Sequence, residues 1–251
     1  MIQVLHLGQV DYNTALELQK TLVDLRKREV ISDTLLLLEH SPVITLGRNA
    51  KQKNVVASLE FLAQKGVELI ECDRGGDVTF HGPGQLVGYP IFDLRQLNPK
   101  IGVIEYVRRI EEVLIRSCGD LGIPTTRIPG LTGVWTTESP QAKIAAIGVH
   151  ISRAVTSHGF ALNVSTDLEY FKLIVPCGIT DKPVTSLERE LGRLLSFEEV
   201  MPVVTRNFGF VFKEQVLWLE SLNDLLPTPA DTPARPPEEL RRLHDEDSYL
   251  A

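Results

Sequence analysis

The sequence contains 251 residues, of which 43% are hydrophobic and 24% charged, a composition typical of a globular protein with one large or two small domains. Its 26 basic and 33 acidic side chains give a net charge of -7, which argues against a general nucleic-acid-binding protein, since such a protein needs a dominant basic surface. It shows no secretory signal, no apolar run near the ~20 residues that cross a bilayer, and three cysteines without CxxC spacing, so neither a disulfide framework nor a zinc site is expected. We therefore expect a cytoplasmic protein that binds neither nucleic acid nor membranes.

Helices and strands alternate along most of the chain. Hydrophobic spacing and turn residues predict, in order, a helix over 15–25, a buried strand over 34–39, a short helix over 58–65, strands over 67–72 and 85–93, and a long helix over 107–121. They then predict strands over 133–136, 143–151 and 154–164, and a helix from the capping box Ser196-Phe-Glu-Glu199 towards Phe212. Pro90 indicates that its strand lies at an edge or contains a bulge, and Ser152-Arg153 indicates an antiparallel hairpin. This mixture predicts an α+β, or mixed α/β, domain.

The composition changes near the end of the chain. Five prolines lie between positions 227 and 237, and the acidic run Asp245-Glu-Asp247 follows. Because proline removes a backbone donor and fixes φ, such a segment cannot continue a packed helix or sheet. We expect one domain over residues 1–225 and a dispensable Pro-rich acidic tail over 226–251.

The densest glycine stretch is Arg74-Gly-Gly-Asp-Val-Thr-Phe-His-Gly-Pro-Gly-Gln85, directly after a predicted strand. Glycines in such a place let backbone N–H groups approach a ligand closely or form tight turns. A cluster of structural turns explains the glycines equally well. It does not explain why Arg74, Thr79 and His81 are interleaved with them.

A thiol and an amine are candidates for catalysis. Cys177 stands between a proline and a glycine at the end of an apolar segment, which suits a thiol on a sharp turn, whereas Cys118 lies on the buried face of its helix and is expected to be a small hydrophobe. Lys143 begins an apolar strand and is either a solvated strand end or a partner of Cys177. An ammonium ~4 Å from the sulfur would lower the thiol pKa and leave much of it as thiolate at neutral pH. The spacing of the His, Asp and Glu residues does not indicate a metal site.

Taken in order, these segments resemble the octanoyl-[acyl carrier protein]:protein N-octanoyltransferase family of lipoate biosynthesis. The resemblance covers about residues 1–212 and rests on the Arg74–Gln85 loop, Lys143-Ile-Ala-Ala-Ile-Gly148, Ser157-His-Gly-Phe-Ala161 and Pro176-Cys-Gly-Ile179. Phe80 stands where tyrosine is commoner in the family.

The resemblance implies the fold of the biotin and lipoate protein ligase catalytic domains, a mixed sheet flanked by helices, working without ATP, cofactor or metal. It implies that Cys177 is the nucleophile and that Lys143 lowers the thiol pKa and later accepts a proton from an incoming amine. It also implies a substrate-binding set, namely Arg74, Gly75, Gly76, Asp77, Val78, Thr79, Phe80, His81, Ala146, Ile147, Gly148, Gly159, Phe160 and Ala161.

The implied reaction passes an octanoyl group from octanoyl-acyl carrier protein, through a thioester on Cys177, to the lysine ε-amine of lipoyl domains. The acceptors implied are the lipoyl domains of 2-oxoacid dehydrogenases and the glycine cleavage H protein. Two alternatives stay open: an ATP-dependent lipoate or biotin ligase of the same fold, and a non-catalytic binder of the carrier or of lipoyl domains. Both partners are expected to present acidic faces. The basic clusters Arg26-Lys27-Arg28 and Arg108-Arg109 would attract these faces, or they are only solvated faces of their helices.

Overall fold

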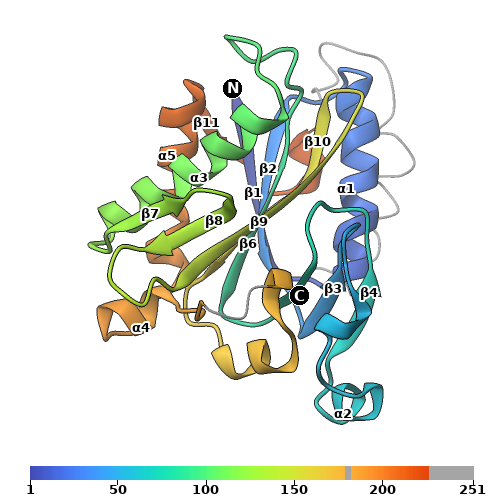
Figure 1. Cartoon of the computed structure of the whole chain (residues 1–251). Helices are drawn as coiled ribbons and strands as arrows, with labels where there is room; N and C mark the ends of the chain where they lie inside the picture. The colour runs from blue at the N-terminus through green and yellow to red at the C-terminus, as the bar shows by residue number, and fades with distance from the viewer. Residues whose placement is uncertain (179–181, 226–251) are drawn as a thin grey trace.

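An eight-stranded sheet with the strand order β11-β1-β2-β6-β10-β9-β8-β7 forms the centre of the protein (Figure 1). The computed structural model describes residues 1–178 and 182–225, apart from the side chain of Cys177, so the predicted tail over 226–251 lies outside the described part. β1 pairs in parallel with β2 and β11, and the other neighbours pair antiparallel. The strands are β1 (Ile2–Gln9), β2 (Asp33–Glu39), β6 (Gln85–Ile91), β7 (Thr125–Ile128), β8 (Leu131–Thr136), β9 (Lys143–Ser152), β10 (Val155–Asn163) and β11 (Val216–Trp218).

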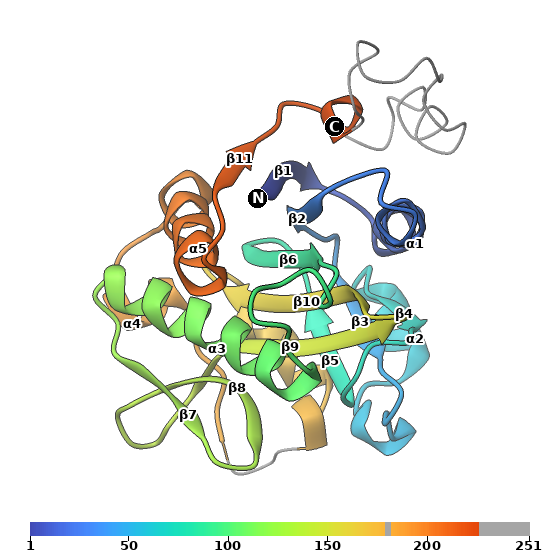
Figure 2. The same ribbon diagram turned by 90° about the horizontal axis from the view of Figure 1, so that it is seen from above.

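Helices cover both faces of this sheet (Figure 2). On one face lie α3 (Val103–Asp120) and α5 (Phe197–Phe212), and on the other lies α1 (Tyr12–Lys27). The short elements α4 (Leu187–Leu191) and η4 (Leu222–Leu225) complete this part. Among the described residues, no helix has the length and apolarity that a bilayer crossing requires.

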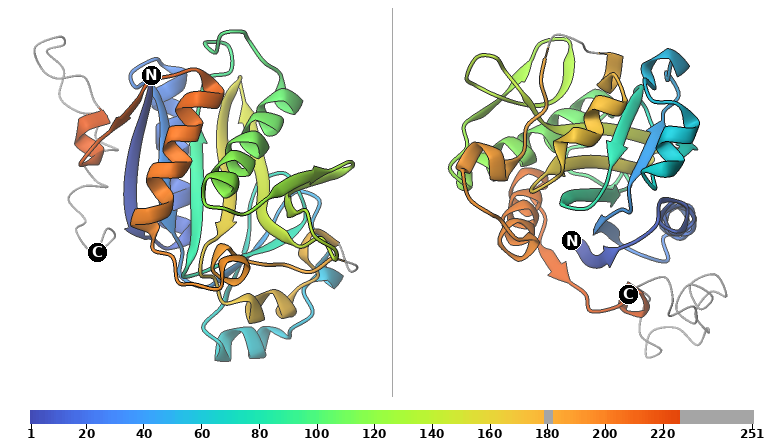
Figure 3. Two further views of the ribbon diagram at one scale, coloured as in Figure 1. Left: turned by 90° about the vertical axis from the view of Figure 1, so that its left-hand side faces the viewer. Right: turned by 90° about the horizontal axis from the view of Figure 1, so that it is seen from below.

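A second, three-stranded sheet with the order β4-β3-β5 packs beside the first on the side of α1 (Figures 1 and 3). It consists of β3 (Val43–Leu46), β4 (Glu68–Glu71) and β5 (Val78–His81). Its own apolar core includes Ile44, Phe80 and Ile174. Around it lie α2 (Leu59–Gln64) and the 3₁₀ turns η1 (Gln52–Asn54), η2 (Leu168–Leu173) and η3 (Pro176–Gly178).

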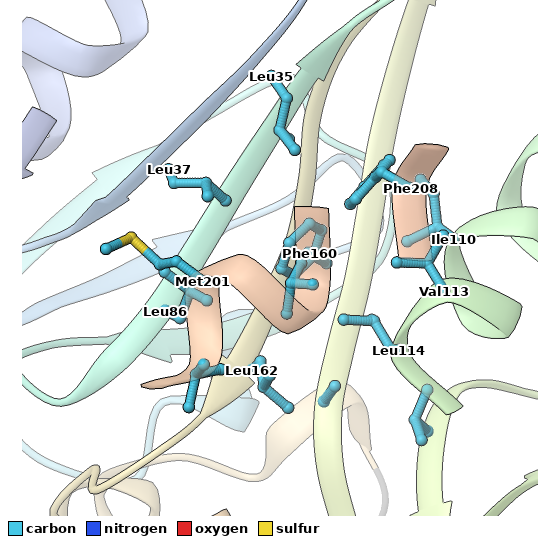
Figure 4. Close-up of a cluster of buried hydrophobic side chains, with 14 of the residues drawn as sticks. Leu35, Leu37, Leu86, Ile110, Val113, Leu114, Phe160, Leu162, Met201 and Phe208 are labelled. Carbon is cyan, nitrogen blue, oxygen red and sulfur yellow. The ribbon is translucent and has the colours of Figure 1, made fainter. Parts of the chain in front are cut away.

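The alternation of side chains along β2 explains its continuous apolar run. Leu35 and Leu37 pack into the cluster beneath α3 and α5 (Figure 4), whereas Leu36 and Leu38 pack towards α1. Successive side chains of a strand point to opposite faces, so a strand covered on both faces is apolar throughout. The predicted buried strand is therefore confirmed.

The predicted helices are confirmed as α1, α2, α3 and α5. Ser196 accepts a hydrogen bond from the Glu199 N–H while the Glu199 carboxylate accepts one from the Ser196 N–H, which is the predicted capping box. The predicted hairpin is also confirmed as β9 and β10. Its two turn residues, Arg153 and Ala154, have φ values of 51° and 68°, the left-handed conformation that matches the twist of paired strands.

The prediction of an edge position for Pro90 is wrong, since β6 lies between β2 and β10. The strand tolerates proline because its pairing with β10 stops at Gly88, opposite Phe160. Beyond that point the Thr156 hydroxyl donates to the Pro90 carbonyl at 2.6 Å. No ladder hydrogen bond between β6 and β10 is lost at Pro90, so the missing N–H carries little penalty.

Candidate active site

Two neighbouring strands, β9 and β10, provide a patch of sheet without large side chains. Their register pairs Ala146 with Ala161 and Gly148 with Gly159, so four adjoining positions leave the sheet surface open. A pocket forms over this floor, lined by Tyr12, Arg74, Gly75, Gly76, Thr79, His81, Tyr89, Ala146, Ile147, Gly148, His158, Gly159, Phe160 and Ala161. It holds about 40 Å³, room for about three water molecules.

Eleven of the fourteen predicted substrate-binding residues line this pocket. The other three, Asp77, Val78 and Phe80, lie outside its lining. Val78 and Phe80 belong to the core of the small sheet, where the Phe80 ring stacks on Tyr170 with 4.7 Å between the ring centroids. Because Phe160 packs on Phe208 on the opposite face (Figure 4), we infer that its backbone borders the pocket.

The glycine-rich loop lies directly on β9. The Gly75 N–H donates to the Val149 carbonyl at 3.0 Å, and a Cβ on Gly148 would lie 2.8 Å from the Gly75 carbonyl oxygen. A Cβ on Gly47, on the other side of the loop, would lie 2.5 Å from the Gly76 carbonyl oxygen. The glycines therefore allow a close packing of backbone on backbone that any side chain would open.

Arg74 places a buried guanidinium in the wall of the pocket. Its side chain donates to the Thr45 hydroxyl and carbonyl and to the Gly75 carbonyl, at distances from 2.7 to 3.1 Å. Only 7% of the residue is exposed, and within the described residues it takes part in no ion pair. A fixed positive charge at low dielectric stabilises negative charge that develops nearby.

Tyr12, His81 and Tyr89, which come from separate elements, form the inner wall, and His40 packs against the two tyrosines. His40 lies between the Val10 carbonyl and the Tyr89 hydroxyl, at 2.7 Å from each. Burial lowers the pKa of His40 to about 4, so its ring is neutral. Because a carbonyl only accepts, Nδ1 of His40 carries the proton and Nε2 accepts from Tyr89. The Tyr12 ring stands 5.2 Å from the His40 ring, and its buried hydroxyl has no hydrogen-bond partner among the described residues.

His81 is fixed in one tautomer by the same logic. Nε2 of Gln85 donates to the Phe80 carbonyl and to Oδ1 of Asn163, so Oε1 of Gln85 is the acceptor for Nδ1 of His81 at 2.8 Å. Burial holds the pKa of His81 well below its usual value. Nε2 of His81 is thus an unprotonated acceptor at neutral pH.

His158 and Asp73 form the outer rim of the pocket. His158 has a φ of 53°, and its Nε2 donates to the Asp73 carboxylate at 2.7 Å. This hydrogen bond is the main reason why the pKa of Asp73 falls to about 2. The backbone N–H of His158 donates to Oε1 of Gln19 in α1 at 2.7 Å, so a helix side chain replaces the missing strand partner.

The backbone of Cys177 forms part of the turn η3, which packs between β5 and η1. The Val175 N–H donates to the Asn54 carbonyl at 2.7 Å, and Nδ2 of Asn54 donates to Asp77 at 2.5 Å. Gly178, at a φ of 68°, lies against both side chains. Asp77 thus shapes the turn that carries the thiol. The predicted contact between Cys177 and Lys143 involves a side chain outside the described part.

Lys143 is buried, with 6% of its surface exposed, so the alternative of a solvated strand end is wrong. Its backbone pairs with Pro183 and Thr185, and its Nζ lies 4.7 Å from the centre of the Trp135 ring, a cation–π contact. Gly133 leaves room for the stem of the lysine.

The two basic clusters expected to steer partners are mostly ion-paired within the protein. Arg26 is buried against Asp33 at 2.8 Å, and Arg108 pairs with the buried Glu111 at 2.6 Å. Lys27 instead donates to the Ser152 hydroxyl, and Arg108 lies on α3, on the face of the sheet opposite the pocket. In residues 1–178 and 182–225, no three His, Cys, Asp or Glu side chains are grouped to hold a metal ion.

Comparison with known proteins shows the family to which this chain belongs. Residues 11–209 match the lipoyl protein ligase A/B catalytic domain, and the chain belongs to that family. The fold is shared with lipoate-protein ligase A bound with ATP, at a TM-score of 0.72 and 16% identity over 97% of this chain and 94% of that one. A bi-partite lipoate protein ligase from Thermoplasma acidophilum gives a TM-score of 0.70 at 17% identity over 99% and 95%. The expected mixed sheet flanked by helices is confirmed.

Within that family, the most similar relatives include octanoyltransferases. The octanoyltransferase of Koribacter versatilis (strain Ellin345) is 84% identical over 250 residues, covering 100% of both chains. That of Acidobacterium capsulatum is 58% identical over 237 residues, 90% of this chain and 96% of the relative. The resemblance to octanoyltransferases drawn from the motifs is confirmed.

Proposed function

We propose that this protein transfers an octanoyl group from octanoyl-acyl carrier protein to the lysine ε-amine of lipoyl domains, through a thioester on Cys177. Its acceptors are the lipoyl domains of 2-oxoacid dehydrogenases and the glycine cleavage H protein. The observation that carries the proposal is the floor of paired small residues, Ala146 with Ala161 and Gly148 with Gly159, in the sheet whose strand β9 begins at the buried Lys143. Octanoyl transfer agrees with the names of the relatives.

In the first step, the Cys177 thiolate attacks the carbonyl carbon of the donor thioester. The new carbon–sulfur bond forms as the carrier sulfur leaves, and the Lys143 ammonium gives that sulfur a proton. The buried guanidinium of Arg74 and the backbone N–H groups of the glycine-rich loop favour the negative charge that develops on the carbonyl oxygen.

In the second step, the ε-amine of the acceptor lysine attacks the acyl-enzyme. Lys143, now neutral, accepts the proton that the amine loses, and Cys177 leaves as a thiolate. Exchange between two thioesters is nearly balanced, whereas an amide is more stable than a thioester, so the transfer runs forward without a nucleotide. Splitting it in two lets a bulky donor and a bulky acceptor visit in turn.

The floor of small residues favours a medium-length chain. Each methylene that leaves water contributes ~0.8 kcal/mol, so a fully buried octanoyl tail gains about 5 kcal/mol over an acetyl group. A thiol nucleophile also has to stay reduced, and we place the reaction in the cytoplasm for that reason.

Intact-mass measurement after mixing with octanoyl-acyl carrier protein tests the proposal. The wild type should gain one octanoyl group and Cys177→Ala none, while Cys118→Ala, which changes a buried cysteine in α3, should be acylated like the wild type. No added mass on the wild type would favour the non-catalytic binder. Lipoyl-domain modification that requires ATP and free octanoate would favour the ligase.

A further inference from the structure

A hollow on the small sheet lies outside the acyl pocket. It holds about 730 Å³, and we call it the β3–α2 groove. Its walls are partly apolar, with Leu46, Val55 and Leu69 among them. The full lining is Leu46, Gly47, Arg48, Ala50, Gln52, Val55, Ala57, Ser58, Leu59, Leu69, Glu71 and Cys72.

One segment separates this groove from the acyl pocket. The N–H groups of Gly47, Arg48 and Asn49 donate to the carbonyls of Asp77, Arg74 and Gly76, at 3.0 to 3.2 Å. The groove and the pocket therefore lie on the two sides of one layer of backbone.

The far end of the groove leads to the turn that carries the nucleophile. Gln52 in the groove lining belongs to η1, the turn that also contains Asn54, and Asn54 holds Val175 next to η3. Just beyond, the Val56 N–H donates to the Leu173 carbonyl at 2.9 Å. A long ligand in the groove thus lies beside the segment that enters the Cys177 turn.

Arg48 lines the groove, and Lys51 and Lys53 flank Gln52, another of its lining residues; we call these three side chains the basic rim. Arg48, Lys51 and Lys53 fall within six positions that contain no acidic residue, and all three are exposed. Within the described residues none of them takes part in an ion pair. In contrast, Arg108 and Arg109 of α3 are both paired with glutamates. Glu71 is the one carboxylate in the groove lining.

We propose that the β3–α2 groove binds the arm of the octanoyl donor, the phosphopantetheine group of the acyl carrier protein, and this rests on the proposed function. The apolar walls contact its methyl and methylene groups. Arg48, Lys51 and Lys53 contact its phosphodiester and the acidic surface of the carrier. The acyl end of the arm then passes over the Gly47–Asn49 segment to the pocket.

Charge reversal tests the basic rim. The triple variant Arg48→Glu, Lys51→Glu, Lys53→Glu should raise the KM for octanoyl-acyl carrier protein by about tenfold or more at low salt and remove most of its salt dependence. The matched control reverses two lysines and one arginine elsewhere, Lys100, Arg189 and Lys213, all exposed and outside the groove, and should leave the KM unchanged.

Donors with and without the phosphate group test whether the basic rim contacts that phosphate. Free octanoyl-phosphopantetheine keeps the phosphate and should also react more slowly with the triple variant, whereas octanoyl-N-acetylcysteamine lacks it and should react as with the wild type. A second variant, Ala50→Phe, narrows the groove and should slow only the phosphopantetheine donors.

An unchanged KM for both phosphopantetheine donors would overturn the proposal. So would a loss confined to the acyl-enzyme's reaction with a lipoyl domain, which would assign this surface to the acceptor. The proposed function fails in a different way, through the absence of acyl-enzyme with every donor, including octanoyl-N-acetylcysteamine.

Discussion

The two faces of the β9–β10 pair differ in what their side chains do. On the face covered by α3 and α5, Phe160 and Leu162 are fully packed, and Phe160 stacks on Phe208 at 5.9 Å between ring centroids. On the other face, alternate residues of the same strands are glycine and alanine, and buried polar groups surround them. The residues of β9 and β10 on the α3/α5 face therefore stabilise the fold, and the small residues on the other face leave space for a ligand. Substitutions on the two faces should separate activity from stability.

Lys143→Met should have the largest effect on activity. If Lys143 is the acid–base group that we propose, its removal should lower kcat by about 100- to 10,000-fold. The free energy of unfolding should stay the same or rise, because a buried ammonium is replaced by an apolar chain of similar size. Single-turnover kinetics across pH would check it, since the thiol ionisation should move up towards its ordinary value. Lys182→Met, which removes a second ammonium 5.9 Å from the centre of the Trp135 ring, is the matched control and should change kcat less than twofold.

Phe208→Ala should lower the stability of the fold and leave the activity unchanged. Loss of a fully buried ring from the α3/α5 face should lower the free energy of unfolding by about 3–5 kcal/mol. Below the melting temperature, kcat should stay near the wild-type value. Urea denaturation and steady-state kinetics on one preparation measure both quantities. A large loss of kcat in fully folded protein would mean that the two faces are not independent.

Ala146→Leu should change chain-length preference. The added side chain fills part of the floor, so kcat/KM for an octanoyl donor should fall about tenfold relative to a butanoyl donor, in line with two buried methylenes at ~0.8 kcal/mol each. Ile147 borders the pocket, but its side chain, like that of its partner Phe160, packs into the core on the opposite face. Ile147→Val should therefore cost about 1 kcal/mol of stability with no change in preference. Equal losses for both donors would assign the acyl chain to another surface.

Asp73→Asn should produce the smallest effect, at the rim of the pocket. The pKa of Asp73 is about 2 in the folded protein, below its ordinary value near 3.9. The carboxylate therefore stabilises the fold above about pH 4, and this contribution disappears as the pH falls through about 2. Because the side chain is 52% exposed, we expect a loss of about 1 kcal/mol at pH 7 after solvent screening. Unfolding curves of wild type and variant should converge between pH 4 and pH 2, and a gap that persists at pH 2 would contradict this origin.

The sequence predicts the long elements of this fold better than the short ones. Apolar spacing over many residues determines α1, α3 and the β9–β10 hairpin, because their periodicity reflects burial of one or both faces. The strands β1, β3, β5, β7 and β11 were not predicted. Three of them have four residues and β11 has three, too few to establish a period, and β5 lies within the glycine-rich loop. The position of Pro90 in a central strand is not predictable from its local sequence, because it depends on where the pairing between β6 and β10 stops.

The motifs indicate most of the pocket, including the residues of its floor, but not the pairing of those residues or the two tyrosines of the inner wall. Gly148 and Gly159 are visible in the sequence, whereas the register that sets them side by side depends on the turn at Arg153 and Ala154. Tyr12, His40 and Tyr89 come from three separate elements and have no shared motif. Tyr12 offers one signal, a polar aromatic residue at the start of the apolar stripe of α1. His81 belongs to a motif, but its tautomer depends on Gln85 and Asn163, which the fold brings together.

Gln19 joins the helix that carries Tyr12 to the strand that carries His158. Tyr12 lines the pocket from the first turn of α1, so a ligand that displaced this ring would also shift the helix. We predict that such a shift would change the hydrogen bond from the His158 N–H to Gln19. The amide resonance of His158 should serve as a spectroscopic gauge of whether the enzyme is charged or empty.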